Sequence, residues 1–223
     1  MTIITSLEHI HKKGRFGNSH KKDGKNLLQI SEVKNLAIIQ LVQYKKSKIQ
    51  PSTIKIGDLD LPLESLKVTT NEETRILWNA PGTWLVISNK KNIISAIKDK
   101  CDDKNFAVTD ISHSRAVIQI KGPQAKEVLK KGCPININEI QVNSCAGTVF
   151  NGITVMVDFV NNNPDTFNVL ALRSFGETFY HHITDAALEF GYLSPSVYIL
   201  INKGGPGSRF CSIPSIPEAI IPA

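Results

Sequence analysis

The residues best suited to hydrolytic chemistry stand together in one short stretch, as Asp110, Ser112 and His113. A Ser–His–carboxylate set can activate a hydroxyl nucleophile when the three side chains converge on one point. Neighbours on a turn or strand do not converge in this way. We therefore expect Asp110 and Ser112 to bond the backbone of a turn and His113 to lie at the surface or an interface. The sequence predicts no catalytic residue.

Sequence motifs for metal or nucleotide binding are also absent. His181 and His182 are adjacent, so both cannot point at one metal from a helix, and His9, His11 and His20 have no Cys or carboxylate cluster beside them. The glycine-rich run Gly204–Ser208 lacks the spacing and the lysine of a phosphate-binding loop, and no G-x-G-x-x-G follows a strand. We expect no metal or cofactor in this chain.

Two arginines and two tryptophans are the candidate contact residues. Arg115 and Arg173 are the two charges that we identify as interrupting apolar strands, and they could bind an anion such as a folate glutamate. They could equally pair with carboxylates inside the protein or across an interface. Trp78 and Trp84 flank a Pro-Gly turn. They are either a ligand-stacking platform or anchors of the core or of a subunit contact.

Composition describes an ordinary globular chain of 223 residues, 41% hydrophobic and 21% charged. The four cysteines are far apart, which argues against a disulfide framework or a zinc site and favours a reducing cytoplasm. No apolar run approaches the length of a membrane span, and no apolar leader begins the sequence, so we expect neither a membrane partner nor secretion.

The excess positive charge is concentrated at the N-terminus. Six Lys and Arg face Glu8 and Asp23 in residues 1–25, which accounts for most of the net charge of +6. Nucleic-acid binding would need these cations on a folded face with aromatic residues, and only Phe16 is present. We expect a solvated or partner-ordered flexible arm over 1–25 and no nucleic-acid partner.

The centre of the chain predicts a strand followed by a helix. Residues 115–120 alternate between apolar and polar faces, Gly122-Pro123 marks the entry to a helix, and Gly132 marks its end. Before this unit, we expect a strand at 36–44, a helical turn at 62–66, a hairpin with strands 72–78 and 83–88, and a helix at 91–102. After it, strands at 145–150, 152–160 and 167–173 precede a helix that a capping box of Ser174 and Glu177 opens.

The last segment differs in character. Residues 194–223 are rich in Pro, Gly and Ile, and Ile213, Ile216 and Ile220 are separated by prolines. Such a segment cannot fold a compact core of its own, and free in water it would expose too much apolar area. We expect an extended tail that docks on another subunit through these isoleucines.

The order of elements favours an α+β fold with antiparallel sheets and helices packed on one face of each. We divide the chain into a basic arm (1–25), a first α+β subdomain (26–105), a second α+β subdomain (106–193) and the tail (194–223).

Three stretches resemble the gamma subunit of heterotetrameric sarcosine oxidase. They are residues 110–136, residues 78–85, and residues 166–175 with the following helix that ends in AALEFG. The resemblance covers roughly residues 30–192, and the sequence departs from it at Ser114, where a glycine is usual, and at both ends. It implies two ferredoxin-like subdomains of the aminomethyltransferase folate-binding fold.

The resemblance also implies a function. Such complexes demethylate sarcosine to glycine, pass the one-carbon unit to tetrahydrofolate and reduce oxygen to hydrogen peroxide. FAD, FMN, NAD and folate belong to other subunits or lie between them, so the expected partners are the larger subunits, chiefly the alpha subunit. The alternative hypotheses are a stand-alone folate-binding aminomethyltransferase relative and a nucleic-acid binder.

Overall fold

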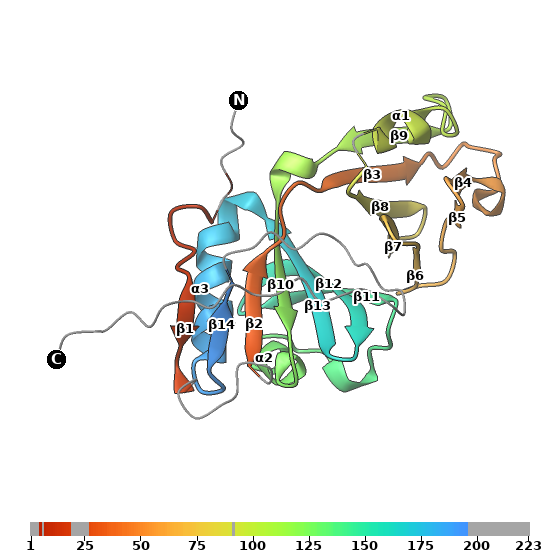
Figure 1. Ribbon diagram of the computed structural model, residues 1–223. Helices are drawn as coiled ribbons and strands as arrows, with labels where there is room; N and C mark the ends of the chain where they lie inside the picture. Colours follow the sequence, from red (N-terminus) through yellow and green to blue (C-terminus); the bar gives the residue numbers. More distant parts are fainter. Residues whose placement is uncertain (1–4, 6, 19–26, 91, 196–223) are drawn as a thin grey trace.

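The computed structural model describes residues 5, 7–18, 27–90 and 92–195, and it is built on two sheets (Figure 1). The seven-stranded sheet has the order β1 (Gly14–Phe16), β14 (Tyr192–Ser194), β2 (Leu28–Glu32), β10 (Arg115–Lys121), β13 (Asp165–Leu172), β12 (Ile153–Asn162) and β11 (Ser144–Phe150). The five-stranded sheet has the order β6 (Val68–Thr70), β7 (Thr74–Ala80), β8 (Thr83–Ser88), β3 (Ala37–Gln43) and β9 (Phe106–Asp110). A small ribbon pairs β4 (Lys55–Ile56) with β5 (Leu59–Asp60).

Each sheet carries its helices on its outer face. Helices α2 (Ala125–Lys130) and α3 (Gly176–Ala187) pack on the seven-stranded sheet, and α1 (Ile93–Lys98) packs on the five-stranded sheet. Single 3-10 turns complete the chain: η3 (Pro51–Thr53), η4 (Ser112–Ser114), η5 (Ile137–Glu139) and η6 (Arg173–Phe175). The predicted α+β class with helices on one face of each sheet is confirmed. No helix in the described ranges has the length and apolar content that a membrane crossing requires.

Alternation along the strands produces three apolar clusters. On β12, Val155 and Val157 face the outer helices, whereas Met156 faces the five-stranded sheet. The outer face of the five-stranded sheet packs on Ile93 and Ile97 of α1. The third cluster lies between the sheets and draws on both of them, which places the sheets against each other. The predicted periodicities therefore select the correct faces.

Two strands, β2 and β9, do not join the sheet of the subdomain to which the sequence assigns them. Residues 26–105 are expected to form the first subdomain, yet β2 pairs antiparallel with β10 and parallel with β14 in the seven-stranded sheet. Residues 106–193 are expected to form the second, yet β9 pairs with β3 in the five-stranded sheet. The reason is burial: Leu28 and Ile30 of β2 complete the core beneath α3, and Phe106 of β9 completes the core beneath α1.

The N-terminal segment also departs from the prediction of a solvated or partner-ordered arm. Within residues 7–18, Leu7 is fully buried, β1 pairs antiparallel with β14, and the ring of Phe16 stacks on Tyr192 with centroids 5.2 Å apart. The segment packs on the sheet because apolar side chains are spaced through its basic sequence, and their burial stabilises the contact. The prediction is corrected for residues 7–18, and residues 19–25 lie outside the described ranges.

Two local predictions need correction. No helix forms at 62–66, where Leu66 adopts a left-handed φ of 66°. Ser174 does not cap α3, because the turn η6 shifts the helix start to Gly176, and its N-cap Phe175 makes no side-chain bond. The predicted end of α2 before Gly132 is confirmed, although Gly132 has no left-handed φ. Instead, a Cβ at this position would lie 2.8 Å from ring atoms of Phe150, so glycine is needed for close approach.

Candidate functional site

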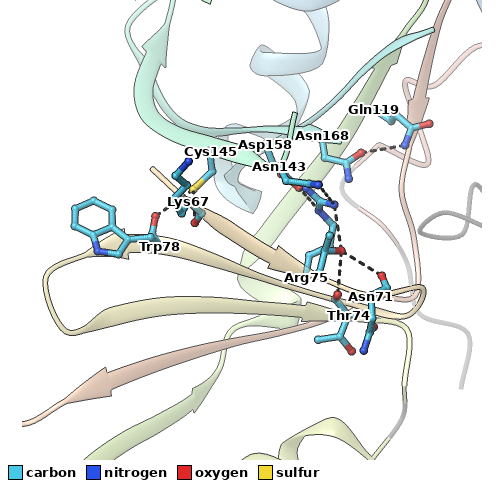
Figure 2. Close-up of polar contacts among 11 residues, drawn as sticks. Lys67, Asn71, Thr74, Arg75, Trp78, Gln119, Asn143, Cys145, Asp158 and Asn168 are labelled. Carbon is cyan, nitrogen blue, oxygen red and sulfur yellow. Dashed lines mark hydrogen bonds and ion pairs between the residues drawn. The ribbon is translucent and has the colours of Figure 1, made fainter. Parts of the chain in front are cut away.

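The most constrained polar contact joins the two sheets. Arg75 of β7 and Asp158 of β12 are 2% and 0% exposed. Arg75 Nε donates to Asp158 Oδ2 at 2.8 Å, and Nη2 donates to Oδ1 at 2.7 Å, which is the bidentate geometry of strong guanidinium–carboxylate pairs. Nη1 donates to Thr70 Oγ1 and to Asn143 Oδ1, each at 3.3 Å (Figure 2). Such complete bonding offsets the desolvation of two buried charges, so the contact fixes one sheet on the other.

A row of buried polar side chains continues from this ion pair across the seven-stranded sheet. Ser31, Gln119, Asn168 and Asp158 occupy neighbouring register positions on β2, β10, β13 and β12, and each is at most 5% exposed. Gln119 Nε2 donates to Asn168 Oδ1 at 3.0 Å (Figure 2). The Ser31 hydroxyl has no hydrogen-bond partner in the part of the chain that the structure describes. The row holds amides, a hydroxyl and a neutralised ion pair, none of which is a reactive group.

Sequence reasoning missed this ion pair although a signal was present. Arg75 comes directly before the apolar residues of β7, and Asp158 stands between apolar residues of β12. Arg115 and Arg173 are therefore not the only two charges in apolar strand stretches among the described residues. A search for acidic as well as basic residues inside the predicted strands would have singled out Arg75 and Asp158. Nothing local could have shown that side chains 83 positions apart meet.

Arg115 lies at the start of β10, opposite Leu172 at the end of β13. Its guanidinium is half-buried, and Nη1 donates only weakly to the Ser114 carbonyl, at 3.5 Å. It forms no ion pair with the described residues, and burial lowers its pKa. Of the alternatives left open by the sequence, a carboxylate pair within the described ranges is therefore not formed by Arg115.

Arg173 follows Leu172 and begins η6, so the two predicted arginines come to the same end of the sheet. Burial of Glu32 raises the pKa of that carboxyl, while the Thr5 hydroxyl, Lys34 and the charge of Arg173 act in the opposite direction. Glu32 Oε2 accepts from Thr5 Oγ1 at 2.8 Å and lies 3.5 Å from Lys34 Nζ. This end of the sheet therefore carries several cations around one buried carboxylate.

The tryptophans pair across the predicted hairpin but are not an exposed platform. Trp78 and Trp84 are register partners on β7 and β8. Trp84 is 2% exposed, and its Nε1 donates to the Pro62 carbonyl at 2.8 Å, so it is a core anchor. Trp78 is half-buried and remains a candidate for a contact.

The stretch from Asp110 to His113 behaves as a turn and not as a triad. Ser112 donates to Asp110 Oδ1 through both its amide and its hydroxyl, and these bonds lower the pKa of Asp110. The Ile38 amide in turn donates to Ser112 Oγ at 2.9 Å. His113 is exposed. The predicted backbone role of Asp110 and Ser112 is confirmed.

A different Ser–His pair is brought together by the fold. Ser194 Oγ lies 2.7 Å from His11 Nε2, and the His11 ring packs edge-on against Tyr180. Burial is the main cause that lowers the pKa of His11, with Lys34 and Lys13 contributing. Ser194 is 1% exposed, and within the described residues no carboxylate bonds His11. The pair fastens the N-terminal segment to β14, and it does not present a nucleophile.

The remaining candidates offer no further chemistry in the described ranges. Burial raises the pKa of Cys101 to about 11 and those of Cys133 and Cys145 to about 12, so these thiols stay protonated. No group of three metal-ligating side chains occurs among the described residues. Ile213, Ile216 and Ile220 lie outside the described ranges, and their docking role stays a prediction.

Comparisons with known proteins identify the family. Residues 50–189 match the model of the sarcosine oxidase, gamma subunit family. The subunit gamma of sarcosine oxidase from Corynebacterium sp. (strain U-96) is 28% identical over 120 residues, which cover 52% of this chain and 58% of that protein. The counterpart from Arthrobacter sp. is 29% identical over 129 residues, covering 56% and 62%. The aligned part of the chain therefore spans less than two thirds of these relatives.

Solved structures share the fold. A chain of the heterotetrameric sarcosine oxidase from Corynebacterium sp. U-96 superposes with a TM-score of 0.71 at 22% identity, covering 84% of this chain and 96% of that one. The glycine cleavage system aminomethyltransferase T from Bartonella henselae gives a TM-score of 0.54 at 10% identity, covering 71% and 45%. The predicted likeness to the aminomethyltransferase fold is confirmed. Since the family model spans more than half of the sequence, the chain belongs to the sarcosine oxidase gamma subunit family.

Proposed function

We propose that this chain is a non-catalytic subunit of a heterotetrameric sarcosine oxidase. The complex would convert sarcosine, tetrahydrofolate and oxygen into glycine, methylenetetrahydrofolate and hydrogen peroxide, in the cytoplasm. The larger subunits, chiefly the alpha subunit, would be its partners and would carry FAD, FMN, NAD and folate. The observation that carries the proposal is the family match over residues 50–189.

The polar groups of the chain support a structural role. A subunit that performed the oxidation itself would need a reactive group or a cofactor cradle with free polar atoms. Here the Asp158 carboxylate is neutralised by Arg75, and the Asp110 carboxylate is bonded by Ser112. The Cys145 thiol is buried with a pKa raised to about 12. These groups are committed to holding the fold together.

The buried carboxylates of the described residues support a place for folate elsewhere in the complex. An acidic residue free to bind the pterin ring is what a stand-alone folate-dependent enzyme of this fold would require. The two buried carboxylates, Asp158 and Glu32, are both engaged, the first by Arg75 and the second by Thr5 and Lys34. We therefore assign folate to the complex and not to this chain.

The proposal is tested by co-expressing the full chain with the other sarcosine oxidase subunits of its source organism. We expect the chain to co-purify with them and the complex to release hydrogen peroxide when sarcosine is added. The purified chain alone should release none. Peroxide formation by the lone chain would refute the non-catalytic role, and micromolar binding of tetrahydrofolate to it in calorimetry would favour the stand-alone alternative.

A further inference from the structure

One connection between the sheets meets the start of α3 at a corner of the molecule. The turn η4 leads from β9 of the five-stranded sheet into β10 of the seven-stranded sheet, and it contacts η6, which leads from β13 into α3. The Ile111 amide donates to the Ile38 carbonyl at 2.9 Å, which ties η4 to β3. We name residues 112–115 and 172–175 the crossover corner.

The crossover corner presents apolar area to solvent. Leu172 and Phe175 are 41% and 48% exposed, although most large apolar side chains among the described residues are buried. The register pairs Leu172 with Arg115, so these two side chains leave the sheet on the same face. Exposed apolar side chains next to an arginine are the usual composition of an interface anchor.

No described residue balances the charge of Arg115 with an ion pair. Its side chain is half-buried, and among the described residues its one hydrogen-bond acceptor is the Ser114 carbonyl, at 3.5 Å. Two carboxylates on the neighbouring strands β9 and β2 are already bonded, Asp110 by Ser112 and Glu32 by Thr5. A guanidinium in this situation is satisfied best by a carboxylate that approaches from outside with two parallel bonds.

We propose that the crossover corner is the docking surface for a segment of a larger sarcosine oxidase subunit in which a carboxylate stands beside an apolar side chain. The carboxylate takes the bidentate position on Arg115, and the apolar side chain covers Leu172 and Phe175. A small free anion would satisfy Arg115 but leave the apolar area in water, which is why a protein segment fits better. This inference rests on the proposed function.

The test compares charge changes at the corner with matched changes elsewhere. The corner variants are Arg115→Glu and Phe175→Asp in the full chain, co-expressed with the other subunits. The controls are Lys55→Glu, at an exposed cation of the β4–β5 ribbon, and Tyr44→Asp, at an aromatic side chain 43% exposed beyond the opposite end of β3. Circular dichroism and thermal unfolding of each variant confirm folding, and Phe175→Ser replaces Phe175→Asp if the latter does not fold.

We expect each corner variant to raise the dissociation constant of the complex about tenfold or more, and each control to change it less than about twofold. Arg115→Lys should give an intermediate loss of affinity, because lysine keeps the charge but cannot donate two parallel hydrogen bonds to a carboxylate. Assembly of both corner variants at wild-type affinity overturns the inference while leaving the proposed function intact. Weakening by Arg115→Glu alone indicates an anion site and also overturns it. If the wild-type chain itself does not assemble, the proposed function fails and the inference falls with it.

Discussion

Arg75 and Asp158 lie 83 positions apart in the sequence, yet two parallel hydrogen bonds of 2.8 and 2.7 Å join them between the sheets. Removing one partner leaves the other charged and buried. We expect Asp158→Ala to lower the free energy of unfolding by about 3–5 kcal/mol, measured by chemical denaturation. The double variant Arg75→Met/Asp158→Leu should recover most of the loss, because neither charge then remains.

A surface pair serves as the control for this prediction. Lys55 and Asp60 are 3.3 Å apart, with side chains 63% and 58% exposed. Lys55→Ala should change the free energy of unfolding by about 1 kcal/mol or less. A loss for Asp158→Ala no larger than that for Lys55→Ala would contradict the importance of the buried pair.

Gly132 is expected to be intolerant of even the smallest side chain. A Cβ there would lie 2.8 Å from the Phe150 ring, which is fully buried and cannot move away freely. We expect Gly132→Ala to cost about 1–3 kcal/mol of stability by overpacking. The cost should shrink in a Phe150→Leu background, and a double-mutant cycle measures that coupling.

Gly147 provides the matched comparison for Gly132. Its added Cβ would meet only Met156 Cε at 3.9 Å, an ordinary contact, and its φ is not left-handed. Gly147→Ala should leave stability unchanged or raise it slightly, since alanine restricts the unfolded chain. Equal losses at Gly132 and Gly147 would show that close approach to Phe150 is not the cause.

The three described cysteines should resist thiol reagents in the native protein. Burial raises the pKa of Cys101 to about 11, so only about one molecule in a thousand carries its thiolate at pH 8. Cys133 and Cys145, raised to about 12, should be slower still. In a Cys211→Ser background, labelling with a maleimide should be slow until denaturant is added. Rapid native labelling of any of the three would mean that its local structure opens readily.

Acid should weaken the attachment of the N-terminal segment. The pKa of His11 is lowered below its usual 6.5, so the unfolded chain takes up a proton before the folded chain does. The contribution of His11 to stability is therefore present above about pH 6.5 and is lost as the pH falls through the lower folded-state pKa. Between pH 7 and pH 5, the free energy of unfolding measured by chemical denaturation should fall more for the wild type than for His11→Gln. The exposed His113→Gln should behave like the wild type, and an identical drop in all three proteins would contradict the assignment.

Local patterns predicted the parts of the fold that depend on neighbouring residues. The Pro81-Gly82 turn and the alternation from Ile153 to Phe159 gave the correct hairpin and the correct faces. The capping box at Ser174 failed because a 3-10 turn occupies the same residues.

The parts that failed depend on distant pairing. Whether β2 joins β3 or β10 cannot be read from its own residues, since Leu28 and Ile30 would suit the helix-covered face of either sheet. The same applies to the contact of His11 with Ser194, which are 183 positions apart. Arg115 stays a candidate contact residue, because a charge in an apolar strand requires an explanation whatever the fold.

The position of β2 also bears on the order in which the chain can fold during synthesis. The five-stranded sheet is continuous in sequence from Ala37 to Asp110, so it can close as soon as that stretch has left the ribosome. The strand β2 emerges earlier but finds its first partner only when β10 appears and its second only with β14. Leu28 and Ile30 therefore stay outside their sheet while most of the protein is synthesised. A chaperone would protect this segment during that interval.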